Sequence, residues 1–199
     1  MEITTVNEIL FEAISKASKI TTKNPQIPVL EYILLDLVDD STLRVTANNL
    51  DILYIQDVFV KTTENTFKKQ SICVSGGLIM SYLGLFNKED QVKIGFSEKS
   101  LVFSINNQKS TINGVSATDY PKTLEIQNSL KETSDSEKVT ISSDLLIQGI
   151  QAVSFAAAVT SIKPELSCVM MSVSNEAVVF VATDAFRLAE KRFSVSNAD

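Results

Sequence analysis

An acidic and a basic side chain stand three residues apart in the segment VATDAFRLAEK, residues 181–191. Asp184 could act as a general base, and Arg187 could hold an anionic substrate. The same residues also suit a turn, because Thr183 and Asp184 follow an apolar run and such side chains commonly bond turn backbone. We favour the turn. An enzyme that depends on Asp184 stays an alternative, weakened because no second acid has a spacing that would place it alongside.

The absence of histidine narrows the chemistry further. It excludes Ser-His-Asp and Cys-His nucleophile systems and imidazole metal sites. Cys73 and Cys168 lie outside any Cys-x-x-Cys motif, so neither a metal site nor a disulfide framework is indicated. We expect two buried free thiols in a reducing cytoplasm, no metal, no cofactor and no catalytic activity.

Two further patterns favour structural roles. Ser75-Gly76-Gly77 is not followed by the Gly-Lys-Ser/Thr of a phosphate-binding loop, so a helix start is the better interpretation. Asp36, Asp39 and Asp40 lack the loop spacing of calcium sites, and a solvated hairpin turn is favoured.

The composition is that of a globular protein of one large or two small domains. A net charge of -6 argues against a uniformly basic coat for nucleic acid, although a local basic surface is possible. No apolar stretch approaches the roughly 20 residues of a membrane helix, and the N-terminus lacks the pattern of a secretion signal. We therefore expect a cytoplasmic location.

An apolar pattern typical of one helix face occurs three times. Its five positions fall at i, i+1, i+4, i+5 and i+8. The copies are Ile9, Leu10, Ala13, Ile14 and Ala17; Leu78, Ile79, Tyr82, Leu83 and Phe86; and Leu145, Leu146, Gly149, Ile150 and Val153. They start 69 and 67 residues apart, which indicates that one structural unit is repeated.

Strand patterns surround each predicted helix in the same order. One short strand is expected before each helix, at residues 2–5, 71–74 and 139–141. The three strands expected after each helix are 29–38, 42–47 and 52–60; 92–96, 101–105 and 110–115; and 166–173, 178–182 and 186–195. The third helix is expected to run from Asp144 to about Ala158. The repeated unit is therefore β-α-β-β-β, an α+β architecture with helices packed on antiparallel sheets.

Two such units should pair into one domain, because one helix cannot cover every apolar sheet face. This predicts a first domain at residues 1–118, a polar interdomain connection at 119–137 and half of a second domain at 138–199. The third unit lacks a partner in the sequence. We expect the chain to be a fragment or to take a partner from another molecule, and to self-associate through an unpaired sheet edge.

Four segments give the chain a family resemblance: NPQIPVLEYILLDL, INGVSATDYP, LSCVMMSV and VFVATDAFRLAEK. Together they resemble the bacterial DNA polymerase III β subunit, a sliding clamp, from Met1 to about Val195. The resemblance implies the DNA-clamp fold, in which two chains with three domains each form a head-to-tail ring. It also implies a processivity factor that encircles duplex DNA without reading its sequence and tethers the replicative polymerase.

The resemblance further implies a hydrophobic cleft for short peptide motifs of the polymerase III catalytic subunit, the clamp loader and repair proteins. In this sequence its residues are Leu166, Thr183, Ala185, Phe186, Arg187 and Leu188. Glycine is common in the family at the position of Ala185, so a left-handed backbone there would strain the alanine.

The family's helices line the central channel and contact DNA phosphates. The corresponding residues here are Lys16, Lys19, Lys23, Asn24 and Lys88. Arginine is common in the family at the position of Asn24. Lys88 is expected at the end of the second helix. The predicted third helix has no basic residue. The acidic charge leaves a second interpretation open, a β-rich protein-interaction module that does not encircle DNA.

Overall fold

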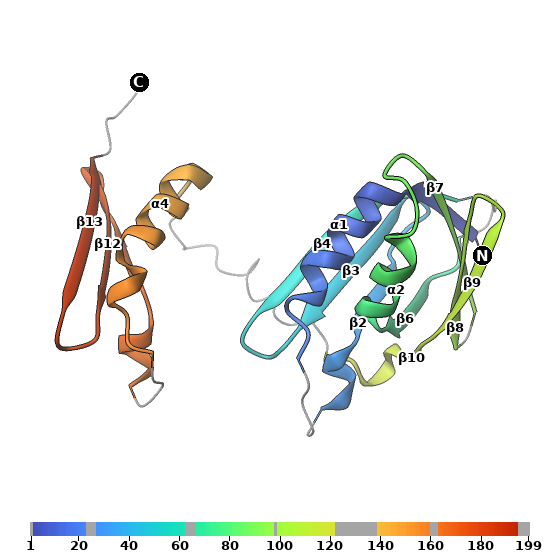
Figure 1. The fold of residues 1–199 in the computed structure, drawn as a ribbon, viewed down its shortest axis with the longest axis horizontal. Coiled ribbons are helices and arrows are strands. Elements are labelled where there is room, and N and C mark those ends of the chain that lie inside the picture. Colours follow the sequence, from blue (N-terminus) through green and yellow to red (C-terminus); the bar gives the residue numbers. More distant parts are fainter. Residues whose placement is uncertain are drawn as a thin grey trace. The chain divides into compact units, whose positions relative to one another are not determined.

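The computed structural model describes residues 2–22, 27–62, 67–97, 99–121, 139–159 and 163–194. These residues form two compact units, one within residues 1–132 and the other within residues 133–199 (Figure 1). Each unit is described by itself below.

The first unit contains two successive copies of the repeat. The first copy consists of β1 (Glu2–Val6), α1 (Asn7–Ser18), the 3-10 turn η1 (Pro28–Glu31), β2 (Ile33–Leu37), β3 (Thr42–Asn48), β4 (Leu53–Phe59) and the short β5 (Lys61–Thr62). The second consists of β6 (Gln70–Val74), α2 (Gly76–Leu83), β7 (Gln91–Phe96), β8 (Ser100–Ile105), β9 (Gln108–Asn113), the short β10 (Val115–Ser116) and the 3-10 turn η2 (Ala117–Asp119).

The two copies are interlocked, because each one gives its first strand to the sheet of the other. The sheet orders are β5-β1-β7-β8-β9 and β10-β6-β2-β3-β4, and all the pairings are antiparallel. β1 comes from the first copy and pairs with β7 of the second, whereas β6 comes from the second copy and pairs with β2 of the first. Neither copy completes its sheet alone.

The helices α1 and α2 lie side by side (Figure 1). Leu10, Ile14, Ile79 and Leu83 are fully buried in the core that the helices share with the inner faces of the sheets. The first position of each pattern is exposed instead, at Ile9 and Leu78, so the buried stripe is narrower than the sequence predicts.

Asn7 ties the start of α1 to the chain that follows α2. Its side-chain amide donates to the carbonyls of Leu83 at 3.1 Å and Asn87 at 3.0 Å. The backbone N–H groups of Asn7 and Glu8 donate to the carbonyls of Asp90 and Lys88. These bonds satisfy N–H groups that a helix start leaves without intrahelical partners.

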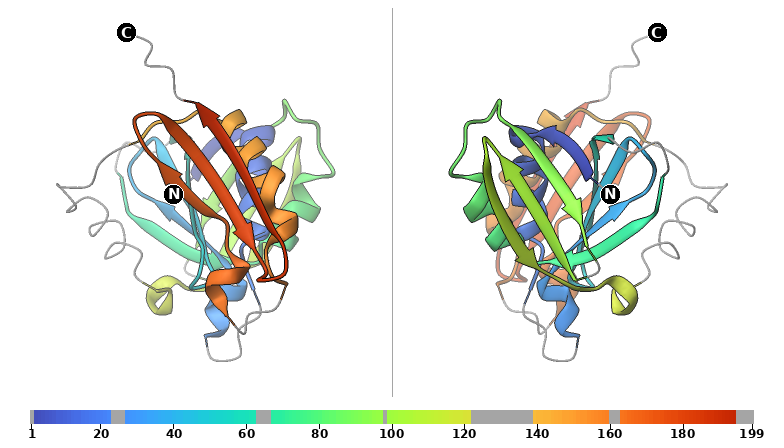
Figure 2. Two further views of the ribbon diagram at one scale, coloured as in Figure 1. Left: turned by 90° about the vertical axis from the view of Figure 1, so that its left-hand side faces the viewer. Right: turned by 90° about the vertical axis from the view of Figure 1, so that its right-hand side faces the viewer.

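Among its described residues, the second unit has one α-helix on a three-stranded antiparallel sheet (Figure 2). Its elements are α4 (Ser143–Val153), the 3-10 turns η3 (Ser154–Ala156) and η4 (Pro164–Ser167), and the strands β11 (Met170–Val173), β12 (Ala177–Thr183) and β13 (Leu188–Ser194). The strand order is β11-β12-β13, and α4 packs against β12 and β13. A Cβ atom at Gly149 would come within 2.3 Å of the Phe180 ring, so only glycine lets the helix approach this closely.

The repeat and the antiparallel sheets predicted from the sequence are confirmed, with several corrections. Residues 139–141 do not form a strand. In the first unit, the corresponding strands β1 and β6 each pair with the other copy of the repeat, and residues 139–141 have no such copy among the described residues. The strands predicted at 29–38 and 166–173 begin with 3-10 turns, where Pro28 and Pro164 cannot donate an N–H.

The second and third helices also end several residues earlier in the sequence than predicted. α2 ends at Leu83, so Lys88 lies in the following loop, and α4 ends at Val153 before the turn η3. Within the described residues, no helix combines the length and apolar character that crossing a membrane requires.

The structure bears on the smaller sequence patterns at Asp39, Cys73 and Cys168. Asp39 accepts hydrogen bonds from the N–H and hydroxyl of Ser41, which confirms the hairpin turn. Across the described part of the chain, no group of three or more Cys, Asp or Glu side chains is placed to hold a metal ion. Cys73 is buried, which raises the pKa of its thiol to about 12, but Cys168 is exposed, so the prediction of two buried thiols is wrong for Cys168.

Candidate functional site

The β12–β13 connection is a turn fixed by its own side chains, as the sequence predicts. The Thr183 hydroxyl donates to the Arg187 carbonyl at 2.7 Å and accepts from the Ala185 N–H at 3.1 Å. The Asp184 carboxylate accepts from the N–H groups of Arg187 at 2.9 Å and Phe186 at 3.0 Å. Its second oxygen accepts from Arg187 Nε at 2.9 Å. The turn residues therefore hold one another in a defined arrangement.

These bonds make Asp184 a poor general base. The N–H groups of Arg187 and Phe186, together with the Arg187 guanidinium, hold the pKa of Asp184 below its ordinary value. A carboxylate stabilised in its charged form has a weakened tendency to take a proton. The structure thus favours the turn over the catalytic interpretation.

Ala185 has a positive φ of 74°. This is the left-handed region, which costs a residue with a Cβ atom about 1 kcal/mol relative to glycine. The strain expected for alanine at this position is therefore present. The hydrogen bonds on either side of Ala185 hold the strained conformation in place.

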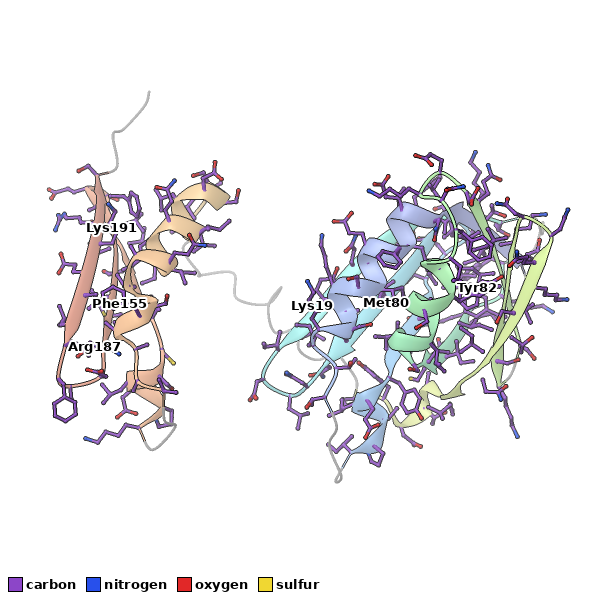
Figure 3. All side chains as sticks on the ribbon, in the orientation of Figure 1. Lys19, Met80, Tyr82, Phe155, Arg187 and Lys191 are labelled. Carbon is purple, nitrogen blue, oxygen red and sulfur yellow. The ribbon has the colours of Figure 1, made fainter. Side chains whose placement is uncertain are left out.

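The turn presents apolar side chains to solvent. Phe186 is 98% exposed and Leu188 is 67% exposed, although both are large hydrophobic residues. Arg187 lies between them in the sequence, at the end of the β12–β13 hairpin (Figure 3). An exposed aromatic ring and leucine beside an oriented guanidinium can bury apolar anchors of a partner and bond its backbone.

Leu166 comes from a different element than the sequence predicts. It lies in η4, not in a strand, and it is half-buried. Its carbonyl accepts from the Ala158 N–H at 2.8 Å, and η4 contacts β12, the strand that leads into the turn. Figure 2 shows η4 and the β12–β13 turn at the same end of the second unit. The structure thus places Leu166 and the turn residues at one end of this unit.

The family resemblance implies that certain lysines contact DNA. Three of them lie around a cavity of about 520 Å³ between α1 and the end of α2. Its lining includes the apolar residues Phe11, Leu83 and Phe86 together with Lys16, Lys19 and Lys88. Lys19 is at the C-terminal end of α1 (Figure 3). Lys23 and Asn24 lie outside the described residues.

Two of these lysines form ion pairs with glutamates. Lys16 Nζ lies 2.6 Å from Glu12, which raises the pKa of Lys16 and lowers that of Glu12, and Lys88 Nζ lies 3.2 Å from Glu8. Sequence analysis did not single out either glutamate. The i,i+4 spacing of Glu12 and Lys16 could have predicted the first pair, but Glu8 and Lys88 are brought together only by the fold.

Comparison with known proteins places both units in one family. A sequence model described as the DNA polymerase III beta subunit, N-terminal domain, matches residues 1–125, and the central domain of the same subunit matches residues 140–199. The chain is 26% identical over 189 residues to a beta sliding clamp from Buchnera aphidicola, covering 95% of this chain and 49% of the relative. A beta sliding clamp from Pseudomonas aeruginosa is 23% identical, and the match covers 95% of this chain and 48% of the relative.

Solved structures share the fold. The DNA polymerase III subunit beta of P. aeruginosa superimposes with a TM-score of 0.81 at 21% identity, covering 97% of this chain and 50% of that one. The beta subunit of Streptococcus pyogenes superimposes with a TM-score of 0.80 at 16% identity, covering 100% of this chain and 51% of that one. A P. aeruginosa sliding clamp bound to griselimycin superimposes with a TM-score of 0.78 at 20% identity, covering 98% of this chain and 50% of that one. The chain spans about half the length of the relatives that it matches.

Proposed function

The chain belongs to the DNA polymerase III beta subunit family, and we propose that it forms the N-terminal part of a sliding clamp. Such a ring encloses duplex DNA and holds a polymerase on its template, so retention does not depend on tight contacts with bases. We assign residues 1–118 to the first clamp domain, 119–137 to a connection and 138–199 to half of the second domain. A homodimeric ring and a cytoplasmic location belong to the same proposal.

The observation that carries this function is the β12–β13 turn with its exposed Phe186 and Leu188. Single exposed apolar residues are ordinary on protein surfaces, but this turn is also oriented by four side-chain hydrogen bonds to its backbone. A pre-ordered apolar surface loses little conformational freedom when a peptide binds. We assign Leu166, Thr183, Ala185, Phe186, Arg187 and Leu188 to one side of a cleft for peptides of the polymerase, the clamp loader and repair proteins.

A role without catalysis fits the same turn. Asp184 is the acid that the sequence offers for an enzyme, and its carboxylate is occupied by the backbone of Phe186 and Arg187. The proposed mechanism therefore uses Asp184 to shape the cleft and to hold Arg187.

Peptide binding tests the proposal directly. A short peptide with leucine and phenylalanine anchors should shift the amide NMR signals of Leu166 and residues 183–188. Arg187→Ala or Leu166→Ala should weaken its affinity about tenfold, the loss expected when a contact worth about 1.4 kcal/mol is removed. Arg192→Ala, another exposed arginine in the same unit, is the control and should leave the affinity unchanged. Shifts confined to other surfaces would remove the turn from the site.

We further propose that α1 faces the DNA backbone. Lys19 follows the last residue of α1, and Lys16, in its last turn, is half exposed beside Glu12. Pairing with glutamate reduces the positive potential that Lys16 and Lys88 present to phosphates. Contact with DNA should therefore be weak and strongly dependent on salt, which suits a ring that slides.

Charge reversal at α1 tests this orientation. Lys16→Glu with Lys19→Glu should weaken the binding of a short duplex at low salt by about tenfold and reduce the slope of log affinity against log salt by about 2. Fluorescence anisotropy measures both quantities. The control, Lys93→Glu with Lys109→Glu on β7 and β9, changes the net charge equally. If both double variants lose affinity to the same extent, α1 is not the DNA-facing element.

A protein-interaction module that does not encircle DNA is the second candidate. The ion pairs of Lys16 and Lys88 with glutamates favour it, because they leave little unpaired positive charge at these two positions. Both candidates predict peptide binding at the turn. They differ in the duplex titration, where the second candidate predicts no change in anisotropy at low salt.

A further inference from the structure

The cavity between α1 and the end of α2 has the size and the lining of a ligand site. Its volume of about 520 Å³ lies within the range of about 300–1,000 Å³ that small-ligand sites occupy. The apolar part of its lining contains two aromatic rings, those of Phe11 and Phe86, and neither ring is fully buried. All of its lining residues belong to the first unit, where both copies of the repeat are present.

Hydrogen bonds join the segments that form the cavity. The Asn7 amide donates to the carbonyls of Leu83 and Asn87. The Glu8 N–H donates to the Lys88 carbonyl at 2.9 Å. The start of α1, the end of α2 and the loop that follows α2 are therefore fixed relative to one another. A cavity with fixed walls loses little conformational freedom when a ligand binds.

Contacts with neighbouring residues position the two rings. Phe86 packs edge-on against Tyr82, with ring centroids 5.1 Å apart. Phe11 lies beside Gly84, where an added Cβ atom would come 3.9 Å from Phe11 Cε2. A larger residue at this position would place its side chain against the Phe11 ring, and glycine places none there.

Lysines stand around the cavity on two separate elements. Lys16 lies in the last turn of α1 and Lys19 directly follows α1, whereas Lys88 lies in the loop after α2. Lys16 is paired with Glu12 and Lys88 with Glu8, but Lys19 forms no ion pair with the described residues. Three lysines and two glutamates leave one net positive charge, so the cavity attracts an anionic ligand weakly.

Aromatic rings with cations around them form the combination that holds single strands of nucleic acid. Bases stack on aromatic side chains, and phosphates contact basic ones. A base within a duplex cannot enter a cavity, because its two faces are stacked between neighbouring bases. A ligand with its charge at one end only, such as a fatty acid or an aromatic carboxylate, would leave the lysine of one element unused.

We propose that this cavity binds one unpaired nucleotide of a DNA strand. The base lies against Phe11 and Phe86, and the phosphates on its two sides face Lys19 next to α1 and Lys88 next to α2. The inference rests on the proposed function for the source of the strand, since α1 is the element that we propose to face DNA. It goes further, because contact with a duplex needs only the lysines, whereas an inserted base needs the rings.

Removal of the bases from a strand tests this proposal. The 199-residue chain is titrated at low salt into a labelled thymine oligonucleotide of about ten nucleotides, and into an abasic strand of the same length and charge. Fluorescence anisotropy should show about tenfold tighter binding of the strand that carries bases. Equal affinities would mean that only phosphates are bound, which overturns the proposal.

Thymidine monophosphate tests whether the ligand is a strand or a free nucleotide. It carries the same base but has a phosphate on one side only. As a competitor it should need at least about a tenfold higher concentration than the unlabelled oligonucleotide. Competition at equal concentrations would mean that the cavity binds a free nucleotide, and a passing strand would be wrong.

Two variants locate the bound base. Phe11→Leu keeps an apolar side chain at the cavity but removes the ring, and Ser15→Trp fills the cavity from α1. Each should reduce the preference for the base-carrying strand to less than about threefold, while circular dichroism shows that the fold is kept. Phe59→Leu, at a ring on β4 that is 66% exposed, is the matched control and should keep the full preference. A preference unchanged in both cavity variants overturns the proposal.

The duplex titration separates this inference from the proposed function. Phe11→Leu should leave the affinity for a short duplex unchanged, because a duplex has no unpaired base to insert. If the duplex responds to charge reversal at Lys16 and Lys19 but bases add nothing to strand binding, the cavity proposal alone fails. If the preference for bases is present and the duplex does not bind, the proposed orientation of α1 toward duplex DNA fails instead.

Discussion

Phe180→Ala is expected to unfold the second unit while the first unit stays folded. The core of the second unit is small, and its buried cluster consists of Val153, Ala156, Val178, Phe180 and Ala182. Phe180 is the largest of these side chains, and its ring packs edge-on against Phe193 with centroids 6.1 Å apart. Removing a buried phenylalanine costs about 3–5 kcal/mol.

A loss of this size is comparable to the whole stability of a small unit. Gly149, which lies against this ring, has no side chain that could fill the space. The first unit has a separate core and should not be affected.

Two-dimensional NMR of the labelled chain measures this result. The signals of residues 143–194 should collapse to the shift range of unfolded protein, and those of residues 2–121 should keep their positions. Phe155→Ala makes the same chemical change in the same unit at a side chain that is 63% exposed, and it should alter stability by less than about 0.5 kcal/mol. A dispersed spectrum of the second unit in Phe180→Ala would show that its stability comes from other contacts.

Asn7→Ala is expected to destabilise the first unit by about 2 kcal/mol. The substitution removes the two well-formed bonds from Asn7 to the carbonyls of Leu83 and Asn87, each contributing about 1 kcal/mol. Because Asn7 is buried, water cannot easily replace the lost donors. The effect should be larger than that of an ordinary substitution at a helix start, since these bonds join the two copies of the repeat.

Urea unfolding followed by circular dichroism gives the free energy of unfolding for this comparison. Asn113→Ala, at an exposed position at the end of β9, is the matched control and should change the free energy by less than about 0.5 kcal/mol. Equal effects of the two substitutions would mean that Asn7 does not join the repeats energetically.

The repeat, its element types and the turn at Asp184 could be predicted from the sequence. Local physical chemistry determines them: apolar residues recur with the helix period, strands alternate, and Thr183 and Asp184 bond the backbone within four residues of themselves. The left-handed conformation of Ala185 follows from the same local turn, and the family resemblance pointed to it.

The pairing of the repeats could not be predicted in this way. β1 leaves its own copy to pair with β7, and Lys88 meets Glu8 across 80 residues of chain. These contacts depend on which elements the folded core brings together. Helical periodicity likewise indicates an apolar side of a helix without stating what covers it, so Ile14, which is fully buried, and Ile150, which is 41% exposed, look alike in the sequence.

The sequence by itself therefore determined the repeating unit and the fold class, and the family resemblance led to the residues proposed for the cleft. Only the tertiary structure decided that the copies exchange strands, that residues 139–141 are not a strand, and that Leu166 lies in a 3-10 turn. The physical reason is that a strand needs a neighbour to satisfy its backbone hydrogen bonds, and that neighbour comes from a distant part of the chain.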